Sequence, residues 1–145
     1  MRVVLQRVRN SRVKVGSDTL AEIEHGVVIL LGIAPQDSEG QAQYLADKIA
    51  NLRIFEDEQG KINRSLLEVS GQAIVVSQFT LYADTRKGRR PSFTDAAPPE
   101  IARPLVQRFA ELLAEQGVKV QCGEFGAHML VEIANDGPVT ILLER

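Results

Sequence analysis

The chain has 145 residues and a mass of 16.0 kDa, enough for one domain to bury a core without disulfides or a structural metal. Hydrophobic residues make up 44% and charged residues 25%, which excludes an intrinsically disordered chain. The net charge of −2 excludes binding to nucleic acid through overall charge, and the single cysteine, Cys122, excludes a disulfide framework and a cysteine-based zinc site.

The apolar runs of the sequence are short. The run at residues 3–5 is too short for the core of a secretory signal peptide. The longest run, residues 27–31, falls far below the ~20 residues that a membrane helix needs. We therefore expect a cytoplasmic protein with no membrane segment, folded as a single domain over residues 1–145.

The first part of the chain is predicted to form strands. Apolar and polar residues alternate over 2–9, which predicts a strand with one buried face, and strand character continues over 13–15. A turn signal at 16–18 separates these residues from a strand over 19–24. Residues 27–33 are apolar without alternation, which predicts a strand buried on both faces.

Two helices are predicted. Ser38 and Gln41 have the spacing of a capping box, and the apolar residues after them repeat at helical spacing, so we expect a helix over 39–52. A second helix is expected over 99–115. Pro104 lacks an amide N–H, so we expect it close to the start of this helix or at a kink.

The remaining strands are expected between and after the helices, at residues 53–55, 73–79, 118–121, 129–134 and 139–143. Asn135-Asp136-Gly137-Pro138 is predicted to break the last two apart. This order of elements predicts an α/β (α+β) fold with mostly antiparallel strands and both helices on one side, rather than a regular βαβ array.

The common signatures of metal, cofactor and hydrolase sites are missing. His25 and His128 have no His or Cys partner at metal-ligand spacing, so no metal is expected. There is no Gly-x-Ser-x-Gly motif, phosphate-binding loop or dinucleotide fingerprint, so no cofactor is expected. His25 is interpreted as a turn residue and His128 as a structural or surface residue rather than a base.

Two places in the sequence stand out against the apolar background. Ser77, Gln78 and Thr80 lie at the exit of an apolar strand, where functional sites are common, although such residues usually satisfy the backbone groups of a turn. Gly137-Pro138 lies between two predicted strands, where a proline is usually part of a plain turn. Neither feature identifies a function alone.

Positive charge is concentrated in two segments. Residues 1–14 carry five cations and no acid, and residues 84–95 carry four cations against two acids. Such segregation suits a local contact with phosphates, while solvated strand faces would explain the charges equally well.

Taken together, the motifs of this chain resemble the signatures of the D-aminoacyl-tRNA deacylases. The matching segments are Gln6-Arg7-Val8, Arg53-Ile54-Phe55, Ser77-Gln78-Phe79-Thr80-Leu81, Arg89-Arg90-Pro91-Ser92-Phe93 and Asn135-Asp136-Gly137-Pro138-Val139-Thr140. They extend from the first predicted strand to the last. The resemblance implies a barrel-like layer of strands, and an editing hydrolase that cleaves D-aminoacyl-tRNA to a free D-amino acid and tRNA.

The resemblance also implies a homodimer with its active sites at the subunit interface. The catalytic segment would be Ser77, Gln78, Phe79 and Thr80 of one subunit, facing Gly137 and Pro138 of the other. The bond between Gly137 and Pro138 would be cis, and this backbone would hold the substrate's ammonium group and leave no room for an L side chain. Glycine has no side chain to exclude, so mischarged glycyl-tRNA is expected to be cleaved as well.

Further residues receive roles from the same resemblance. Arg7 is expected to orient the Gly-Pro carbonyls by forked hydrogen bonds, with an ordinary surface arginine as the alternative. Met129 is expected to line the pocket. Phe93 is expected to pack near the terminal adenosine or to anchor its own loop. The expected contacts to the tRNA backbone are Arg86, Lys87, Arg89 and Arg90.

Thr80 is the natural candidate nucleophile, but the sequence offers no base to activate it. An aminoacyl ester is already labile, so we expect attack by water, assisted by the 2′-hydroxyl of the terminal adenosine and by backbone N–H groups around residues 78–80. Two alternatives stay open. One is a non-catalytic RNA-binding dimer, and the other is a small-molecule esterase that uses Thr80.

Overall fold

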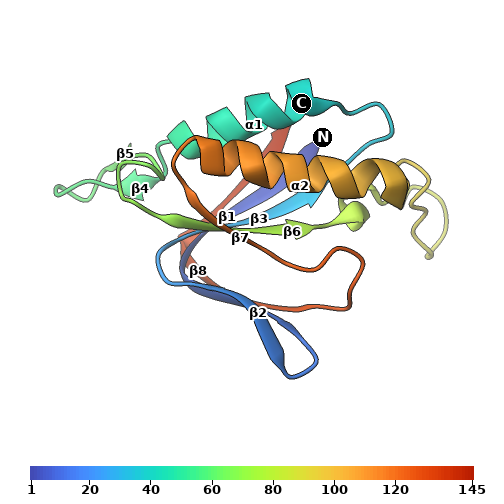
Figure 1. Cartoon of the computed structure of the whole chain (residues 1–145), viewed down its shortest axis with the longest axis horizontal. Coiled ribbons are helices and arrows are strands. Elements are labelled where there is room, and N and C mark those ends of the chain that lie inside the picture. Colours follow the sequence, from blue (N-terminus) through green and yellow to red (C-terminus); the bar gives the residue numbers. More distant parts are fainter.

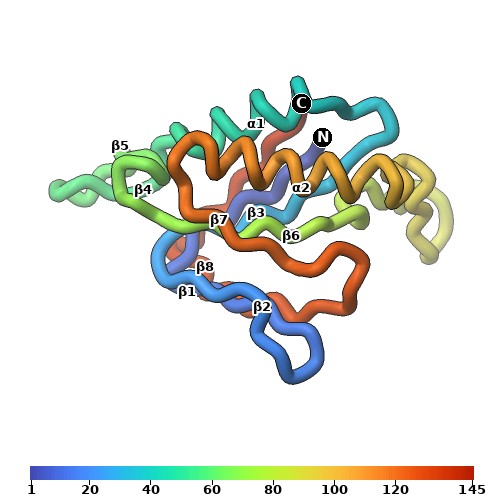
Figure 2. Tube along the Cα trace, in the orientation of Figure 1, coloured from blue at the N-terminus to red at the C-terminus, as the bar shows by residue number.

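A computed structural model describes residues 1–145 as a strongly curved sheet with two helices on one side (Figure 1). The elements in chain order are β1 (Arg2–Val15), β2 (Asp18–Ile23), β3 (Gly26–Gly32), α1 (Glu39–Asn51), β4 (Phe55–Glu56), β5 (Ile62–Arg64), β6 (Gln72–Ser77), a 3-10 helix η1 (Phe79–Tyr82), α2 (Pro99–Glu115), β7 (Lys119–Cys122) and β8 (Leu130–Glu144). The predicted α/β class with a barrel-like layer and two helices on one side is confirmed, and the Cα trace in Figure 2 follows the same layers.

Strand β1 organises the sheet because it is long enough to pair with three others. Its first half pairs antiparallel with β3, its second half pairs antiparallel with β2, and β8 runs antiparallel along its other edge. The parallel pairs β3–β6 and β6–β7 complete the main sheet. The side chain of Gln121 on β7 bonds the backbone of Glu22 on β2 in both directions, at 3.0 and 2.6 Å, and so brings the two ends of the layer together.

Both faces of the central strands are buried. On β6, Ala73 and Val75 belong to the larger core between the sheet and the helices, whereas Ile74 and Val76 belong to a smaller core inside the curved layer. A strand between two cores needs apolar residues at every position, which explains the missing alternation in β3. The prediction of a doubly buried strand at residues 27–33 is therefore confirmed.

The helices lie within a residue of their predicted bounds. The Ser38 N–H donates to Gln41 Oε1 at 3.0 Å at the start of α1, as a capping box requires. α2 has the predicted bounds, and Pro104 lies inside it, close to its start. Helix α2 contributes Phe109 and Leu113, both fully buried, to the larger core. Neither helix has the length and apolar composition to cross a membrane.

The predicted break between the last two strands is wrong. Strand β8 runs from Leu130 to Glu144 through the Asn-Asp-Gly-Pro segment, because both of its halves pair with the same long strand. The register shifts on either side of Val8 accommodate the extra residues as a bulge. Gly137-Pro138 is a cis bond within this bulge, exposed to solvent.

Other boundaries move for related reasons. The predicted strands 2–9 and 13–15 are one strand, since β8 supports both parts. The strand predicted at 73–79 ends at Ser77, and the chain continues as the 3-10 helix η1. The strand predicted at 53–55 begins at Phe55.

Candidate functional site

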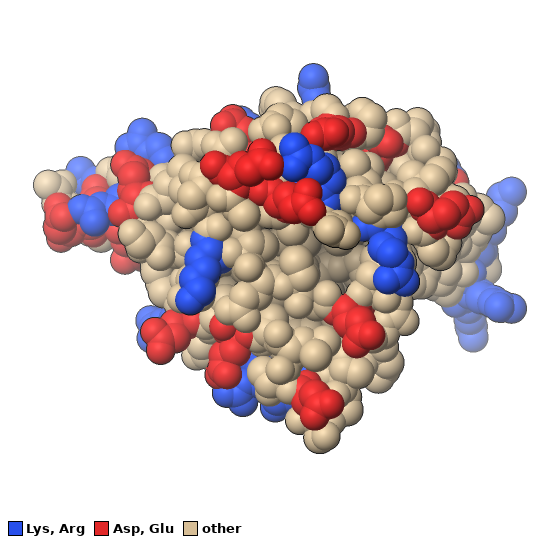
Figure 3. Space-filling model, in the orientation of Figure 1, with Lys and Arg blue, Asp and Glu red and all other residues tan.

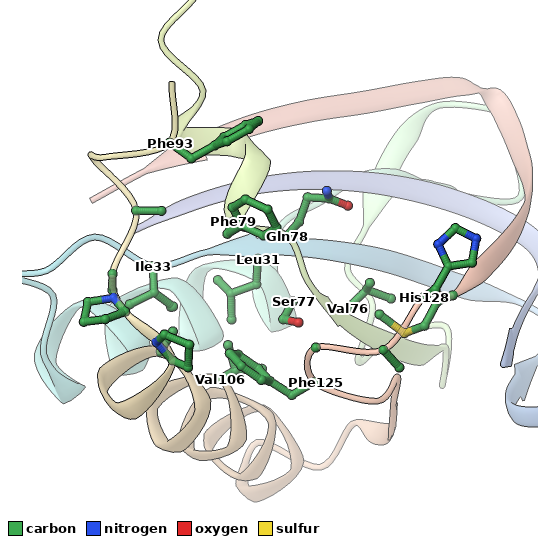
Figure 4. Close-up of a pocket in the computed structure, with 18 of the residues that line it drawn as sticks. Leu31, Ile33, Val76, Ser77, Gln78, Phe79, Phe93, Val106, Phe125 and His128 are labelled. Carbon is green, nitrogen blue, oxygen red and sulfur yellow. The ribbon is translucent and has the colours of Figure 1, made fainter. Parts of the chain in front are cut away.

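An apolar cavity of about 610 Å³ lies at the carboxyl end of β6, between the start of α2 and the segment that leads into β8 (Figure 4). Its walls come from four parts of the chain: the ends of β3 and β6, the residues before and within the first turns of α2, and residues 125–131. The larger side chains of the lining are Leu31, Ile33, Val76, Gln78, Phe79, Phe93, Val106, Phe125, His128, Met129 and Val131.

Ser77 is the polar side chain at the centre of this wall, and Figure 4 shows it directed into the space between Leu31 and Phe125. Parallel pairing sets its position, because Ser77 lies opposite Leu31 and the next amide, that of Gln78, donates to the Leu31 carbonyl at 2.8 Å. The strand then turns into η1, whose first internal bond runs from the Leu81 N–H to the Gln78 carbonyl at 3.2 Å.

The start of η1 offers backbone donors near the cavity. A helix leaves the N–H groups of its first residues without partners inside the helix, so those of Phe79 and Thr80 are available. The close packing of η1 on β3 depends on Gly32, where an added Cβ would lie 3.1 Å from the Gln78 carbonyl oxygen. A side chain at this position would require the turn to move by a few tenths of an ångström.

Thr80 itself lies outside the cavity lining and is exposed. Its hydroxyl oxygen accepts a hydrogen bond from the side-chain amide of Gln78. An amide N–H is a donor and cannot remove the hydroxyl proton. The structure therefore places no base on Thr80, in agreement with the sequence.

Two aromatic rings stand at the mouth of the cavity. Phe79 and Phe93 meet edge to face, with ring centroids 5.1 Å apart and an interplanar angle of 72°. Both rings are exposed, Phe79 by 57% and Phe93 by 38%, although aromatic side chains of this size are usually buried. Phe125 also lines the cavity, and the guanidinium of Arg103 lies over its ring, with Cζ 4.8 Å from the ring centroid.

The basic loop, residues 84–92, begins beside these rings. The backbones of Asp84 and Ser92 close it through two hydrogen bonds of 2.7 and 2.9 Å. Within it the four predicted tRNA-binding cations, Arg86, Lys87, Arg89 and Arg90, are all exposed. Figure 3 shows Lys and Arg side chains projecting from the end of the molecule where this loop lies in Figure 1.

One of these cations is engaged within the loop. Arg86 donates to the Asp84 carboxylate through Nε at 2.9 Å and Nη2 at 2.8 Å, and its backbone N–H adds a third bond at 3.0 Å. These bonds lower the pKa of Asp84 to about 2. Lys87, Arg89 and Arg90 make no ion pair within the chain and remain free for an external anion.

Arg7 lies in the interior beside the Gly-Pro bulge, with 4% of its surface exposed. Its guanidinium donates to the carbonyl of Ile54 at 2.7 Å and to that of Asp136 at 3.2 Å. The expected fork onto the carbonyls of Gly137 and Pro138 is therefore not what the chain forms: Arg7 bonds the residue before them. The alternative of an ordinary surface arginine is wrong.

The two predicted parts of the site lie far apart within one chain. Ser77 pairs with Leu31, which pairs with Val3, whereas the bulge lies against Arg7, four residues farther along β1. Four residues of strand span ~13 Å, and three strand spacings of ~4.8 Å separate β6 from β8. Gly137 and Pro138 therefore do not enter the cavity of their own chain.

The sequence missed most of the cavity wall. Residues 96–99, Ala102 and Val106 on the α2 side, and residues 125–128 before β8, line it together with the predicted Ser77 to Phe79, Phe93 and Met129. The run of small residues before an apolar helix was the available signal, since such residues leave space beside a strand end. No group of three or more His, Cys, Asp or Glu side chains is arranged to hold a metal ion.

Acid should loosen the basic loop. Because the folded-state pKa of Asp84 lies below its ordinary value of 3.8, its contacts to Arg86 stabilise the loop fully above that value and are lost as pH falls through about 2. We expect the Asp84 carboxyl carbon to titrate by NMR with a midpoint of about 2. In Arg86→Gln this midpoint should rise toward 3.8, and an unchanged midpoint would contradict the assignment of the cause.

Comparison with known proteins identifies the family. The chain matches the model described as D-Tyr-tRNA(Tyr) deacylase over residues 4–144. It is 62% identical over 144 residues to a protein of Roseiflexus sp. (strain RS-1) named D-aminoacyl-tRNA deacylase, in a match that covers 99% of this chain and 93% of that one. The resemblance inferred from the motifs is thus confirmed.

Two solved structures share the fold. One, named c-Myc DNA Unwinding Element Binding Protein, is 40% identical, with a TM-score of 0.93 over 100% of this chain and 99% of that chain. Another, described as a probable eukaryotic D-amino acid tRNA deacylase, has a TM-score of 0.84 over 98% and 97% at 20% identity, which supports the fold alone. Because the family model matches residues 4–144, nearly the whole of this chain, the chain belongs to the D-Tyr-tRNA(Tyr) deacylase family.

Proposed function

We propose that this chain is a cytoplasmic, single-domain editing hydrolase that cleaves the ester of D-aminoacyl-tRNA to a free D-amino acid and tRNA. The observation that carries the proposal is the Ser77-to-Thr80 segment at the wall of an apolar cavity, in a chain 62% identical to a protein named D-aminoacyl-tRNA deacylase. The basic loop beside the same cavity supplies exposed cations for the phosphates of the tRNA acceptor end.

The active unit is a homodimer in which each cavity receives Gly137 and Pro138 of the partner subunit. The separation of the two motifs within one chain supports this arrangement, and both residues are exposed when the chain is alone. A second exposed feature lies on the same strand. Leu142 is 77% exposed beside Val4, as expected for a residue that another subunit covers.

The cavity holds the 3′-terminal adenosine and brings its ester to Ser77. At about 610 Å³ it is of the size that takes a small ligand, and its lining is mainly apolar. Phe79, Phe93 and Phe125 offer ring faces and edges against which a base can stack. Met129 also lines the cavity.

Discrimination follows from shape. The partner's Gly-Pro backbone places its carbonyl oxygens against the substrate's ammonium group and occupies the space that an L side chain needs. Such a wall is insensitive to the identity of a D side chain, and it has nothing to exclude in glycine. Arg7 supports the wall indirectly, because it fixes the Asp136 carbonyl next to Gly137.

Hydrolysis proceeds by attack of water on the ester carbonyl carbon. The N–H groups at the start of η1 stabilise the oxyanion that forms. The C–O bond to the 3′-oxygen then breaks, and the proton lost by the water reaches that oxygen through the adjacent 2′-hydroxyl. This route needs no side-chain base. It agrees with the contact at Thr80, whose hydroxyl is bonded to the amide N–H of Gln78, a donor, and to no group that could accept its proton.

A second candidate is a non-catalytic nucleic-acid-binding dimer. The 40% identical structure, whose name describes a protein that binds a DNA unwinding element, favours it, as do the free cations of the basic loop. A small-molecule esterase that uses Thr80 is the third, and the lack of a base beside Thr80 weighs against it.

Substrate selectivity separates these candidates. Purified protein should hydrolyse D-tyrosyl-tRNA on the order of 100-fold faster than L-tyrosyl-tRNA, and should also hydrolyse glycyl-tRNA, measured as loss of labelled aminoacyl-tRNA. Binding of D-tyrosyl-tRNA without hydrolysis would support the second candidate. Intact glycyl-tRNA beside hydrolysed D-tyrosyl-tRNA would refute the steric wall but leave the deacylase.

The role of Thr80 is tested by a matched pair of changes. Thr80→Ala should retain activity within about threefold, because the hydroxyl does not attack, whereas D-tyrosyl-tRNA ending in 2′-deoxyadenosine should lose about 100-fold or more. Single-turnover rates measure both. An inactive Thr80→Ala that still binds tRNA would establish the covalent route instead.

The basic loop should set the salt dependence of tRNA binding. The triple variant Lys87→Gln, Arg89→Gln, Arg90→Gln should show a smaller slope of log Kd against log salt, by ~0.9 for each phosphate that it no longer neutralises, measured by fluorescence anisotropy. Arg108→Gln is the matched control, since Arg108 is occupied by Glu39, Glu111 and Glu115. Equal slopes for wild type and triple variant would remove the loop from the interface.

A further inference from the structure

The side chains of Asn135 and Thr140 form a hydrogen bond across the Gly-Pro bulge. Asn135 Oδ1 accepts the backbone N–H of Val139 at 3.2 Å, and Asn135 Nδ2 donates to Thr140 Oγ1 at 2.9 Å. Gln6 on β1 donates to the same Thr140 oxygen at 3.2 Å. The Asn135 side-chain amide thus bonds the last residue of the bulge, Val139, and the first residue after it, Thr140. We call this set of bonds the Asn135 brace.

The brace lies where the sheet gives the backbone no support. Strand β8 pairs with β1 at Thr140 and at Asn135, but residues 136–139 between them have no partner in the ladder. Hydrogen bonds of the sheet therefore do not set the direction of the Gly-Pro peptide groups. Side chains do so instead, with Arg7 bonded to the Asp136 carbonyl on one side of Gly137 and Asn135 bonded to the Val139 N–H on the other.

The two supports act on different atoms. Arg7 holds the first residue of the bulge through a carbonyl, and Asn135 holds its last residue through an N–H. An asparagine suits this place because a single short side chain both accepts and donates a hydrogen bond. Thr140 also accepts a hydrogen bond from Gln6 on β1. The position of the bulge is therefore fixed relative to β1, the strand that organises the sheet.

We propose that Asn135, acting with Thr140, is a positioning residue for stereospecificity: it sets the direction of the Gly137-Pro138 backbone that faces the substrate. The inference rests on the proposed function, because it assigns the brace to the wall that excludes L side chains. Loss of the brace lets the bulge shift, so that the L ester gains access while the chemistry on the D ester, carried out by the other subunit's η1 segment, continues.

The test compares hydrolysis of D- and L-tyrosyl-tRNA by Asn135→Ala and Thr140→Val with wild type. Removing one or two hydrogen bonds corresponds to about a tenfold effect, so the ratio of kcat/KM for the D ester to that for the L ester should fall about tenfold in each variant. Thr140→Ser retains the hydroxyl oxygen and should therefore keep the wild-type ratio.

Asn51→Ala is the matched control. It removes an asparagine side chain whose hydrogen bonds are to Asp47 within helix α1, including one to the backbone carbonyl at 2.9 Å, and which forms no hydrogen bond to the bulge. Its D-to-L ratio should equal that of wild type. Thermal unfolding of every variant separates a general loss of stability from a change in selectivity, and Thr140→Val, which preserves side-chain shape, serves if Asn135→Ala does not fold.

The outcomes for the inference and for the proposed function are distinct. If wild type is stereospecific and both brace variants keep its D-to-L ratio, even with lower melting temperatures, the brace is only structural and the inference is wrong. If wild type cleaves neither ester, or both equally, the proposed function fails first. A fall in the ratio that Thr140→Ser does not show and Asn51→Ala does not share supports the inference.

Discussion

The pairing of β1 along its full length is the interaction on which the rest of the structure depends. This strand has β3 and β2 on one edge and both halves of β8 on the other, so it sets the positions of both parts of the candidate site. Through β3 it determines where β6 ends and Ser77 faces the cavity. Through β8 it determines where the Gly-Pro bulge leaves the sheet.

The same pairing separates the two motifs, and this separation is why the proposed site needs a second copy of the chain. A rigid sheet cannot fold back to bring Gly137 to Ser77, because the distance is set by residue rise and strand spacing rather than by flexible loops. A backbone wall supplied by another subunit can, in contrast, be presented by a rigid element, which suits a filter that works by exclusion.

The proposed reaction needs only a modest acceleration, and the candidate site contains groups that bind and orient a substrate rather than a side-chain base. The site consists of an apolar cavity, exposed aromatic rings, available backbone N–H groups and a loop of cations. No base is bonded to the one threonine hydroxyl in the proposed catalytic segment. For an ester that is already labile, binding and orientation can provide most of the acceleration. Arg7 and Asn135, each with several hydrogen bonds, hold the backbone of the bulge in place and lie outside the cavity.

The sequence by itself determined the two helices, the doubly buried strand at 27–33, the fold class and the family, because burial periodicity, capping and motif spacing are local properties of the chain. Only the tertiary structure decided that β8 continues through Gly137-Pro138, that Arg7 is buried against Asp136, and that α2 and residues 125–131 complete the cavity. Each of these depends on pairing or packing between segments far apart in sequence. The local sequence pattern does not show which strand a segment will pair with. Here pairing with β1 keeps β8 continuous although Asn135-Asp136-Gly137-Pro138 is a strong turn signal.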